Sequence, residues 1–306
     1  MQLALYTHAS CLRHEPGAGH PESPARLKAV LEALDTDRFA GVDRIEAPRA
    51  TREQLLRAHS PGQVEAVFAQ APQEGDVRID ADTVMSTGSL EAALRAAGAV
   101  CAAVDAVIDA QHERAFCAVR PPGHHATHAQ AMGFCLFNNV AIGATHALAR
   151  GLQRVAIVDF DVHHGNGSQD IFENEARVLY ASTHEMPLYP GSGLRRETGV
   201  GNIVNEPLPS GGGSGEFRTA YRERILPALN AFKPQLLLIS AGFDAHKLDP
   251  LANLNLDAED YAWVTQELLD IARKHARGRV VSTLEGGYSL TALRQSVQAH
   301  VAALLD

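Results

Sequence analysis

Short apolar runs alternate with longer segments of helical apolar spacing through the second half of the chain. The runs are rich in Val, Ile and Leu, and they predict buried strands over residues 115–119, 155–160, 178–182, 236–240 and 280–284. The segments between and after them predict helices over residues 134–150, 169–173, 217–232, 258–275 and 290–305. This alternation predicts an α/β fold of three layers, in which helices cover both faces of a mainly parallel sheet.

The first third of the chain carries the same two kinds of element. Residues 3–6 predict a strand, and an Ala-rich segment over residues 90–110 predicts a long buried helix. Three further helices are predicted by start signals, a Pro at the first position or a Thr cap, at Pro24, Thr51 and Pro61.

Two segments lack periodicity and are rich in turn residues. Residues 75–89 and 186–215 therefore predict long loops, and we expect such loops at the rim of a functional site. The second of them is an alternative candidate for an interface between copies of the chain, so a homo-oligomer stays open. No segment has the composition of a linker or a repeat, and we predict one domain over residues 1–306.

Composition narrows the classes of partner. The 306 residues are 45% hydrophobic and 21% charged, which is typical of a globular domain, and the net charge of −9 argues against a nucleic-acid partner. No apolar run approaches membrane-spanning length, and residues 1–10 do not resemble a signal peptide, so we expect no membrane partner. Four cysteines without a CxxC pair predict reduced thiols and a cytoplasmic protein.

The most informative stretch is RVAIVDFDVHHGNG, residues 154–167. An apolar strand ends there in Asp159, Asp161 and His163 at every second position, with His164 next. Alternate residues of an extended chain share one face, so two carboxylates and an imidazole would converge. One such residue would indicate only a polar turn. Three together favour a bound divalent cation, because they would otherwise be buried without compensation.

Three other predicted strands also end in polar sequences. The first ends in VRPPGHHA, with His124 and His125; the second in ISAGFDAH, with Asp244; and the third in STLEGGY, with Tyr288. Parallel strands place their carboxyl ends at one edge of the sheet, where ligands bind. We therefore expect these side chains to lie beside Asp161.

The chemistry of the converging side chains suggests a different role for each group of residues. Asp161, His163 and Asp244 form a three-ligand set that leaves one position of a tetrahedral zinc ion for water or substrate. The same ligands would also accept Fe²⁺. The sequence therefore predicts a catalytic rather than a purely structural metal site.

The remaining polar residues provide acid–base chemistry. The pair His124 and His125 would supply a general base and acid, with Asp159 holding one imidazole and Asn166 the other. Tyr288 would donate a hydrogen bond to an oxyanion. Together these residues predict hydrolysis of an amide by a metal-activated water.

The motifs PPGHHA, GFCLFNN, DFDVHHGNG, SAGFDAHKLDP and LEGGY resemble those of the histone deacetylase superfamily, in the same order, and the resemblance begins at HPESPARL. That superfamily includes the bacterial amidohydrolases and the acetylpolyamine amidohydrolases. The resemblance implies an arginase-like fold and a zinc-dependent deacylase of acylated amines. It gives the metal ligands, histidine pair and Tyr288 the roles described above.

The resemblance also implies features that the residues alone do not show. One is a structural potassium ion at Asp159, Asp161, His163, Ser182 and Thr183. Another is a substrate tunnel lined by Gly133, Phe134, Tyr189 and Leu251, with Asp82 at its rim.

The subtype and substrate follow from three positions. Asn166 stands where class I members have Asp, which resembles class II and would polarise His125 less than a carboxylate. Leu251 stands where polyamine-selective eukaryotic members carry an acidic residue, which favours an acyl-lysine peptide or a small amide over an acetylated polyamine. Tyr288, rather than His, favours a competent deacetylase.

One alternative shares the arginase-like fold, and the other belongs to a different functional class. A binuclear manganese ureohydrolase would need further carboxylates where the chain has Gly165 and His246. A non-catalytic sensor of a small ligand would not need the histidine pair or Tyr288. Both are therefore disfavoured.

Overall fold

An eight-stranded sheet with the strand order β2–β1–β5–β10–β9–β6–β7–β8 runs through the computed structural model, which describes residues 3–306. Every neighbouring pair of strands in it is parallel. Its strands are β1 (Leu3–Thr7), β2 (Asp43–Glu46), β5 (Arg114–Cys117), β6 (Val155–Asp159), β7 (Val178–Glu185), β8 (Ile203–Leu208), β9 (Leu236–Ala241) and β10 (Val280–Leu284). The predicted α/β class is confirmed.

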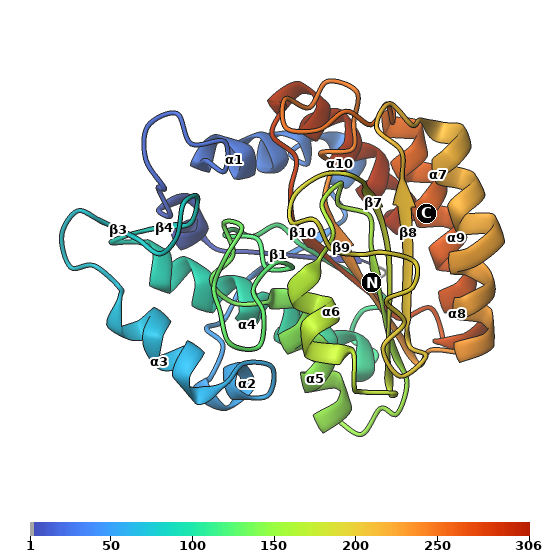
Figure 1. Ribbon diagram of the computed structural model, residues 1–306, viewed down its shortest axis with the longest axis horizontal. Helices are drawn as coiled ribbons and strands as arrows, with labels where there is room; N and C mark the ends of the chain where they lie inside the picture. Colours follow the sequence, from blue (N-terminus) through green and yellow to red (C-terminus); the bar gives the residue numbers. More distant parts are fainter. Residues whose placement is uncertain (1–2) are drawn as a thin grey trace.

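Helices cover both faces of this sheet (Figure 1). On one face, α4 (Ser89–Ile108) and α5 (Asn139–Ala149) pack against the strands and against each other. On the other, α9 (Ala258–His275) packs on β9 and on α10 (Leu290–Leu305), and α1 (Pro24–Ala33) packs on α10. The shorter helical elements are η1 (Ala9–Leu12), η2 (Asp37–Phe39), α2 (Arg52–Leu56), α3 (Pro61–Ala69), α6 (Asn166–Phe172), α7 (Ser214–Ala220), η3 (Tyr221–Ile225) and α8 (Leu226–Phe232).

The apolar runs form the middle layer because helices cover both sides of each strand. Every residue of β5, β6, β9 and β10 is buried, which accounts for their near-continuous hydrophobicity. The four cysteines are also buried, and none of them forms a disulfide within residues 3–306. Within residues 3–306, no helix combines the length and the apolar character needed to cross a membrane.

Two predicted loops were wrong in part. Residues 75–89 contain the antiparallel strands β3 (Asp76–Arg78) and β4 (Val84–Ser86), and residues 186–215 contain β8 at the sheet edge. These strands are short, and only partner strands distant in the sequence or across a turn stabilise them.

Two predicted helices were also wrong in extent. The helix expected from residue 134 begins at Asn139, because Phe134 has a left-handed backbone (φ 68°) and Asn138 caps the helix by accepting a hydrogen bond from the Ala141 N–H. The helix expected over residues 217–232 contains the π-helical turn η3 just before Pro227, which has no N–H to donate.

The sheet order decides where the site lies. The four strands with polar endings, β5, β10, β9 and β6, are consecutive neighbours at the centre of the sheet. Their carboxyl ends therefore bring the predicted residues to one edge. The single domain over residues 1–306 stays a prediction, and residues 1 and 2 lie outside the described residues.

Candidate active site

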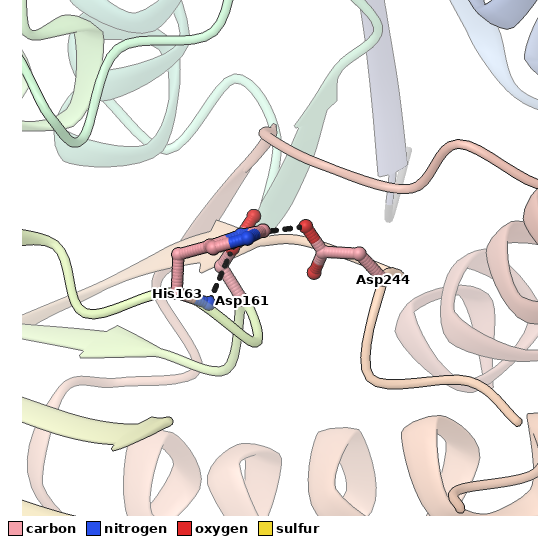
Figure 2. Close-up of side chains that lie close together, drawn as sticks. All are labelled: Asp161, His163 and Asp244. Atoms are coloured by element: carbon pink, nitrogen blue, oxygen red, sulfur yellow. Dashed lines mark hydrogen bonds and ion pairs between the residues drawn. The ribbon is translucent and has the colours of Figure 1, made fainter. Parts of the chain in front are cut away.

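Asp161, His163 and Asp244 converge beyond the ends of β6 and β9 (Figure 2). One potential ligand atom from each lies within 4.8 Å of the others, and all three residues are buried. His163 Nδ1 lies 3.1 Å from Asp161 Oδ1 and 3.2 Å from Asp244 Oδ2. The three predicted ligands are thus brought together from segments 80 residues apart.

The donor set fits a divalent cation. The backbone N–H of Gly286 donates to Asp161 Oδ2, and that of Val162 donates to Asp244 Oδ1. Asp244 Oδ2 is buried and accepts no well-aligned hydrogen bond within residues 3–306; its ionic neighbour is His163 Nδ1, which is itself a candidate ligand. A metal ion between these two groups would compensate the buried carboxylate charge.

Electrostatics support the same interpretation. Burial and the charge of Asp161 raise the pKa of Asp244 to about 7. Burial lowers the pKa of His163, but the two carboxylates outweigh it and raise this pKa to about 10. The three groups therefore hold extra protons when no metal compensates the carboxylates, and a metal ion would replace those protons.

Two glycines allow the backbone to approach the ligands. A Cβ at Gly242 would lie 2.0 Å from Asp161 Oδ2, and one at Gly286 would lie 2.1 Å from Asp244 Oδ2. Any larger residue would displace a carboxylate, so these glycines in the AGFD and EGGY motifs serve close packing.

The two adjacent imidazoles have different partners. His124 Nδ1 faces Asp159 Oδ2 at 3.0 Å, and the same oxygen accepts a hydrogen bond from Tyr180. His125 Nδ1 faces Asn166 Oδ1 at 2.7 Å. The ring centroids of the two histidines are 4.0 Å apart. The pairings predicted for Asp159 and Asn166 are therefore present in the structure.

The pKa values of the two histidines shift in opposite directions. Burial lowers the pKa of His124, but Asp159 and Asp161 outweigh burial and raise it to about 10. Burial and the charges of His124 and His163 lower the pKa of His125 well below its usual value. At neutral pH His124 is a cation and His125 a neutral imidazole, with Nε2 of His125 as its acceptor nitrogen.

Tyr288 follows the Gly286–Gly287 pair at the end of β10. Its ring lies 5.9 Å from the ring of Phe134 and 4.8 Å from the guanidinium of Arg26, measured at ring centroids. Burial raises the pKa of Tyr288 well above its usual value. The phenol therefore remains protonated as a hydrogen-bond donor.

The residues expected to line a tunnel lie next to this group. A Cβ at Gly133 would lie 2.6 Å from the His125 ring, so Gly133 packs directly on the imidazole. Tyr189 has its ring centroid 5.1 Å from that of His125 and is 39% exposed. Phe134 packs edge-on against both Tyr288 and His20.

The two remaining tunnel positions lie on neighbouring loops. His20, which packs on Phe134, is 3.0 Å from the carbonyl of Asp82, so the β3–β4 hairpin lies beside Phe134. Leu251 is 36% exposed on the loop that follows Asp244. The contacts of His20 therefore bring Asp82 near Phe134. Leu251 is linked to Tyr288 through Asp249, whose carboxylate accepts the N–H groups of both residues.

The residues expected at a potassium ion also cluster. Ser182 on β7 lies in register beside Asp159 on β6, and both are buried. The hydroxyl of Thr183 is buried with no hydrogen-bond partner within residues 3–306. The potassium site itself stays a prediction.

The sequence singled out Glu285 at the end of a strand without giving it a role, and it did not single out Asp249. Glu285 accepts hydrogen bonds from the N–H groups of Gly123 and His124, and burial raises its pKa to about 7. Asp249 accepts from the N–H of Tyr288 at 2.7 Å. Both residues lie within the motifs LEGGY and KLDP, which could have indicated them. Only the tertiary structure shows which backbone N–H groups they accept.

A buried ion-pair network was missed as well. Glu22 pairs with both Arg26 and Arg120, and Arg26 also donates to the carbonyl of Gly287. Glu22 precedes Ser23, the N-cap of α1, so its four-residue spacing from Arg26 is not that of a pair on a helix face. No local pattern therefore predicts this buried pair next to Tyr288.

Comparison with known proteins agrees with this geometry. The family model described as "Histone deacetylase domain" matches residues 20–304. The chain belongs to the histone deacetylase family. The family assignment based on the motifs is thereby confirmed, and so is the arginase-like α/β fold.

Individual relatives cover almost the whole chain. A "Probable deacetylase" of Archaeoglobus fulgidus is 41% identical over 95% of this chain and 82% of its own length. A "Histone deacetylase-like amidohydrolase" of Pseudomonas aeruginosa is 39% identical over 89% of this chain and 73% of its own. The crystal structure of the HDA15 HD domain superposes with a TM-score of 0.95 at 37% identity, covering 99% of this chain and 88% of that one.

Proposed function

We propose that this deacetylase-family protein is a zinc-dependent amidohydrolase that removes acetyl or other acyl groups from an amine. The observation that carries the proposal is the convergence of Asp161, His163 and Asp244, with the ring centroid of His125 6.0 Å from that of His163. A base and a Lewis-acid site would then lie side by side, and Tyr288 would supply a phenol from the end of β10. Deacetylase and amidohydrolase relatives support this class of reaction.

Asp161, His163 and Asp244 would hold the metal, zinc in vitro and zinc or Fe²⁺ in the cell. When bound, such an ion polarises an amide carbonyl and lowers the pKa of a water molecule. The two carboxylates would balance the charge of a divalent ion, so the ion and its three ligands together would be neutral before substrate enters. The fit rests on the donor types and on their convergence, in which the buried Asp244 Oδ2 faces only the candidate ligand His163 among the ion pairs of residues 3–306.

His125 acts as the general base. Asn166 accepts a hydrogen bond from Nδ1, so Nε2 is the nitrogen available to take a proton from the attacking water. The resulting imidazolium then donates that proton to the leaving amine. His124, a cation beside Asp159, supplies positive charge for the negative charge that develops on the substrate.

Tyr288 donates its phenolic hydrogen to the oxygen of the substrate carbonyl as that oxygen becomes negative. The contacts of its ring with Phe134 and Arg26 support this role, because they limit the movement of the ring. Gly133, Phe134 and Tyr189 would form the tunnel wall, with Leu251 and Asp82 at the entrance.

Further proposals concern the setting of the enzyme. We propose a structural K⁺ at Asp159, Asp161, His163, Ser182 and Thr183, supported by the buried Ser182 in register beside Asp159. We also propose a cytoplasmic enzyme, supported by four buried free cysteines. Its substrate is an acylated amine, either an acyl-lysine peptide or a small amide.

The test is a rate panel on zinc-loaded enzyme. Acetyl-lysine peptides, longer acyl-lysine peptides and N-acetylated polyamines are compared by kcat/KM. We expect turnover of acyl-lysine peptides, because Leu251 offers no carboxylate to a polyamine cation. A strong preference for a polyamine would overturn that substrate assignment, and no turnover with metal bound would favour the sensor function.

Two variants assign the roles. His125→Ala is expected to abolish turnover while retaining zinc, whereas Asp161→Ala is expected to lose the metal. Near-normal rates for His125→Ala would disprove the assignment of the base.

A further inference from the structure

Asp249 lies on the loop between β9 and α9, five residues after Asp244. The residue is 8% exposed, and its carboxylate accepts three backbone hydrogen bonds. Oδ1 accepts from the N–H of Leu251 at 3.0 Å. Oδ2 accepts from the N–H of Tyr288 at 2.7 Å and from that of Ser289 at 3.2 Å. One side chain therefore links the loop that carries Asp244 to the segment that carries Tyr288.

The two residues before Tyr288 are held through their own backbone, since the Gly286 N–H donates to Asp161 and the Gly287 carbonyl accepts from Arg26. These bonds leave the N–H groups of Tyr288 and Ser289 to find acceptors elsewhere. Both preceding residues are glycines, and Gly287 has φ +118°, a conformation that side-chain-bearing residues rarely adopt. Tyr288 and its neighbour Ser289 precede the first turn of α10, so their N–H groups have no acceptor inside that helix. Asp249 supplies the acceptor for both.

The position of Asp249 is itself well determined. Its N–H donates to the carbonyl of His246 at 2.8 Å, and its bond to Leu251 closes a tight Asx turn that orients the carboxylate. Asp249 and Asp244 belong to the same loop, residues 242–257. A displacement of the carboxylate would therefore move Tyr288 relative to Asp244.

We propose that Asp249 is a positioning residue for Tyr288. It sets the distance between the phenolic hydroxyl and the metal ligand Asp244, and it does not touch the reacting atoms. This inference rests on the proposed function, in which Tyr288 stabilises the oxyanion. Because that interaction forms only in the transition state, a misplaced Tyr288 lowers kcat more than it raises KM.

Asp249→Asn is the informative substitution. Asparagine has the same shape but only one acceptor oxygen, so its amide group would face either the N–H of Leu251 or those of Tyr288 and Ser289. A shift of about 1 Å at a catalytic group costs on the order of 100-fold in rate. We expect Asp249→Asn to lower kcat about 10- to 100-fold on an acetyl-lysine peptide, with KM changed less than about threefold.

A double-mutant cycle with Tyr288→Phe isolates the positioning role. In the Tyr288→Phe background the hydroxyl is absent, so Asp249→Asn is expected to change kcat less than about twofold. Zinc content is expected to stay that of the parent in all four proteins. An equal loss of kcat in both backgrounds, or loss of zinc from Asp249→Asn, would overturn the proposal.

Two further variants complete the design. Asp260→Asn removes a buried carboxylate that also accepts a backbone N–H, that of Asp257, but has no contact with Tyr288; it is expected to retain the parent kcat. If Asp249→Asn does not fold, Asp249→Glu keeps both acceptor oxygens on a longer side chain. It is expected to lower kcat only when Tyr288 is present, and an equal loss in both backgrounds would again contradict the proposal.

The cycle also separates this inference from the proposed function. Tyr288→Phe with the parent kcat would disprove the role of Tyr288, whatever Asp249 does. A slow Tyr288→Phe combined with a fully active Asp249→Asn would disprove only the positioning by Asp249.

Discussion

The imidazole of His125 faces the amide oxygen of Asn166 at 2.7 Å, whereas the adjacent His124 faces a carboxylate, Asp159, at 3.0 Å. The carboxylate stabilises the imidazolium of His124, and the neutral amide gives His125 no such charge. This difference separates the protonation states of two histidines whose rings are in contact. It leaves one of them able to accept a proton at neutral pH.

Asn166→Asp tests this asymmetry. A carboxylate at this position would raise the pKa of His125, which is now held well below its usual value by burial and by the charges of His124 and His163. The base would then stay protonated to higher pH, so the acidic limb of kcat/KM is expected to move upward by about one pH unit or more. A pH–rate profile from pH 5 to 9 measures it. An unchanged acidic limb would mean that another group titrates there.

Asp244→Asn tests the metal site separately from the fold. Burial and Asp161 raise the pKa of Asp244 to about 7, so a neutral asparagine resembles the protonated form present in the metal-free protein. We expect the metal-free variant to melt within a few degrees of the metal-free parent. Zinc is expected to raise the Tm of the parent but not that of the variant, and the variant's turnover is expected to be lost.

Metal content and thermal melts with and without zinc measure these outcomes, with Asp260→Asn as the control that retains zinc. A variant that binds zinc like the parent would show that Asp244 is not a ligand.

Gly133→Ala tests the packing of the tunnel wall on the base. Gly133 has φ +57° and Gly75 has φ +64°, so alanine costs roughly 1–2 kcal/mol of backbone strain at either position. Only at Gly133 would the new Cβ lie 2.6 Å from the His125 ring, because Gly75 has no neighbour within 4 Å of that position. We therefore expect Gly133→Ala to lose most activity and Gly75→Ala to keep it. Similar kcat/KM values for the two variants would contradict this.

Leu251→Glu tests the origin of substrate preference. Leu251 is 36% exposed at the proposed entrance, and a carboxylate there would attract the second ammonium group of a polyamine. An exposed ion pair contributes about 0.2–1 kcal/mol, so kcat/KM for an acetylated polyamine relative to an acetyl-lysine peptide is expected to rise about 1.4- to fivefold. The control is Leu248→Glu at a 52% exposed position of the same loop. An equal rise in both variants would indicate general charge attraction rather than a specific contact.

His300 gives a pH dependence of stability that is separate from catalysis. Its Nδ1 lies 2.6 Å from the Thr265 hydroxyl and its Nε2 lies 2.8 Å from that of Ser282, and burial lowers its pKa to about 3. The unfolded chain binds a proton at this histidine below about pH 6.5, whereas the folded protein does not until about pH 3. Stability from this group is therefore present above pH 6.5 and is lost as the pH falls from 6.5 to 3.

His300→Gln removes this titration. The unfolding free energy of the variant is expected to fall less steeply between pH 6.5 and pH 4, by about 1.4 kcal/mol per pH unit relative to the parent. Denaturant melts across this range measure the slopes, and His128→Gln at an exposed position is the control. Parallel slopes for the parent and His300→Gln would refute the prediction.

Local chemistry was enough to predict many of the candidate residues that the fold brings together. The apolar run before Asp159 predicted a buried strand, and alternation placed Asp161 and His163 on one face of the chain. The motifs around His124, Asp244 and Tyr288 predicted strand ends at one edge of a parallel sheet. The structure adds that β5, β10, β9 and β6 are consecutive neighbours, which makes the convergence close.

The errors lie where short-range patterns carry little information. Residues 134–138 have helical composition, but the left-handed backbone at Phe134 places that ring beside Tyr288 and delays the helix. The strands β3 and β4 are three residues each and pair across a turn, and β8 pairs only with β7 at the sheet edge. Their stability comes from partners that no local pattern shows.

Residue types and their spacing in the chain were sufficient for the fold class, the family, the candidate metal ligands and the histidine pair, because these depend on local periodicity and on donor chemistry. Only the tertiary structure decided which neighbouring residues hold the candidate catalytic residues in position. The bonds from Asp249 to Tyr288 and from Glu285 to the backbone of His124 join segments 39 and 161 residues apart. A carboxylate acquires such partners only when distant strand ends meet, since any buried backbone N–H must find an acceptor wherever the fold places one.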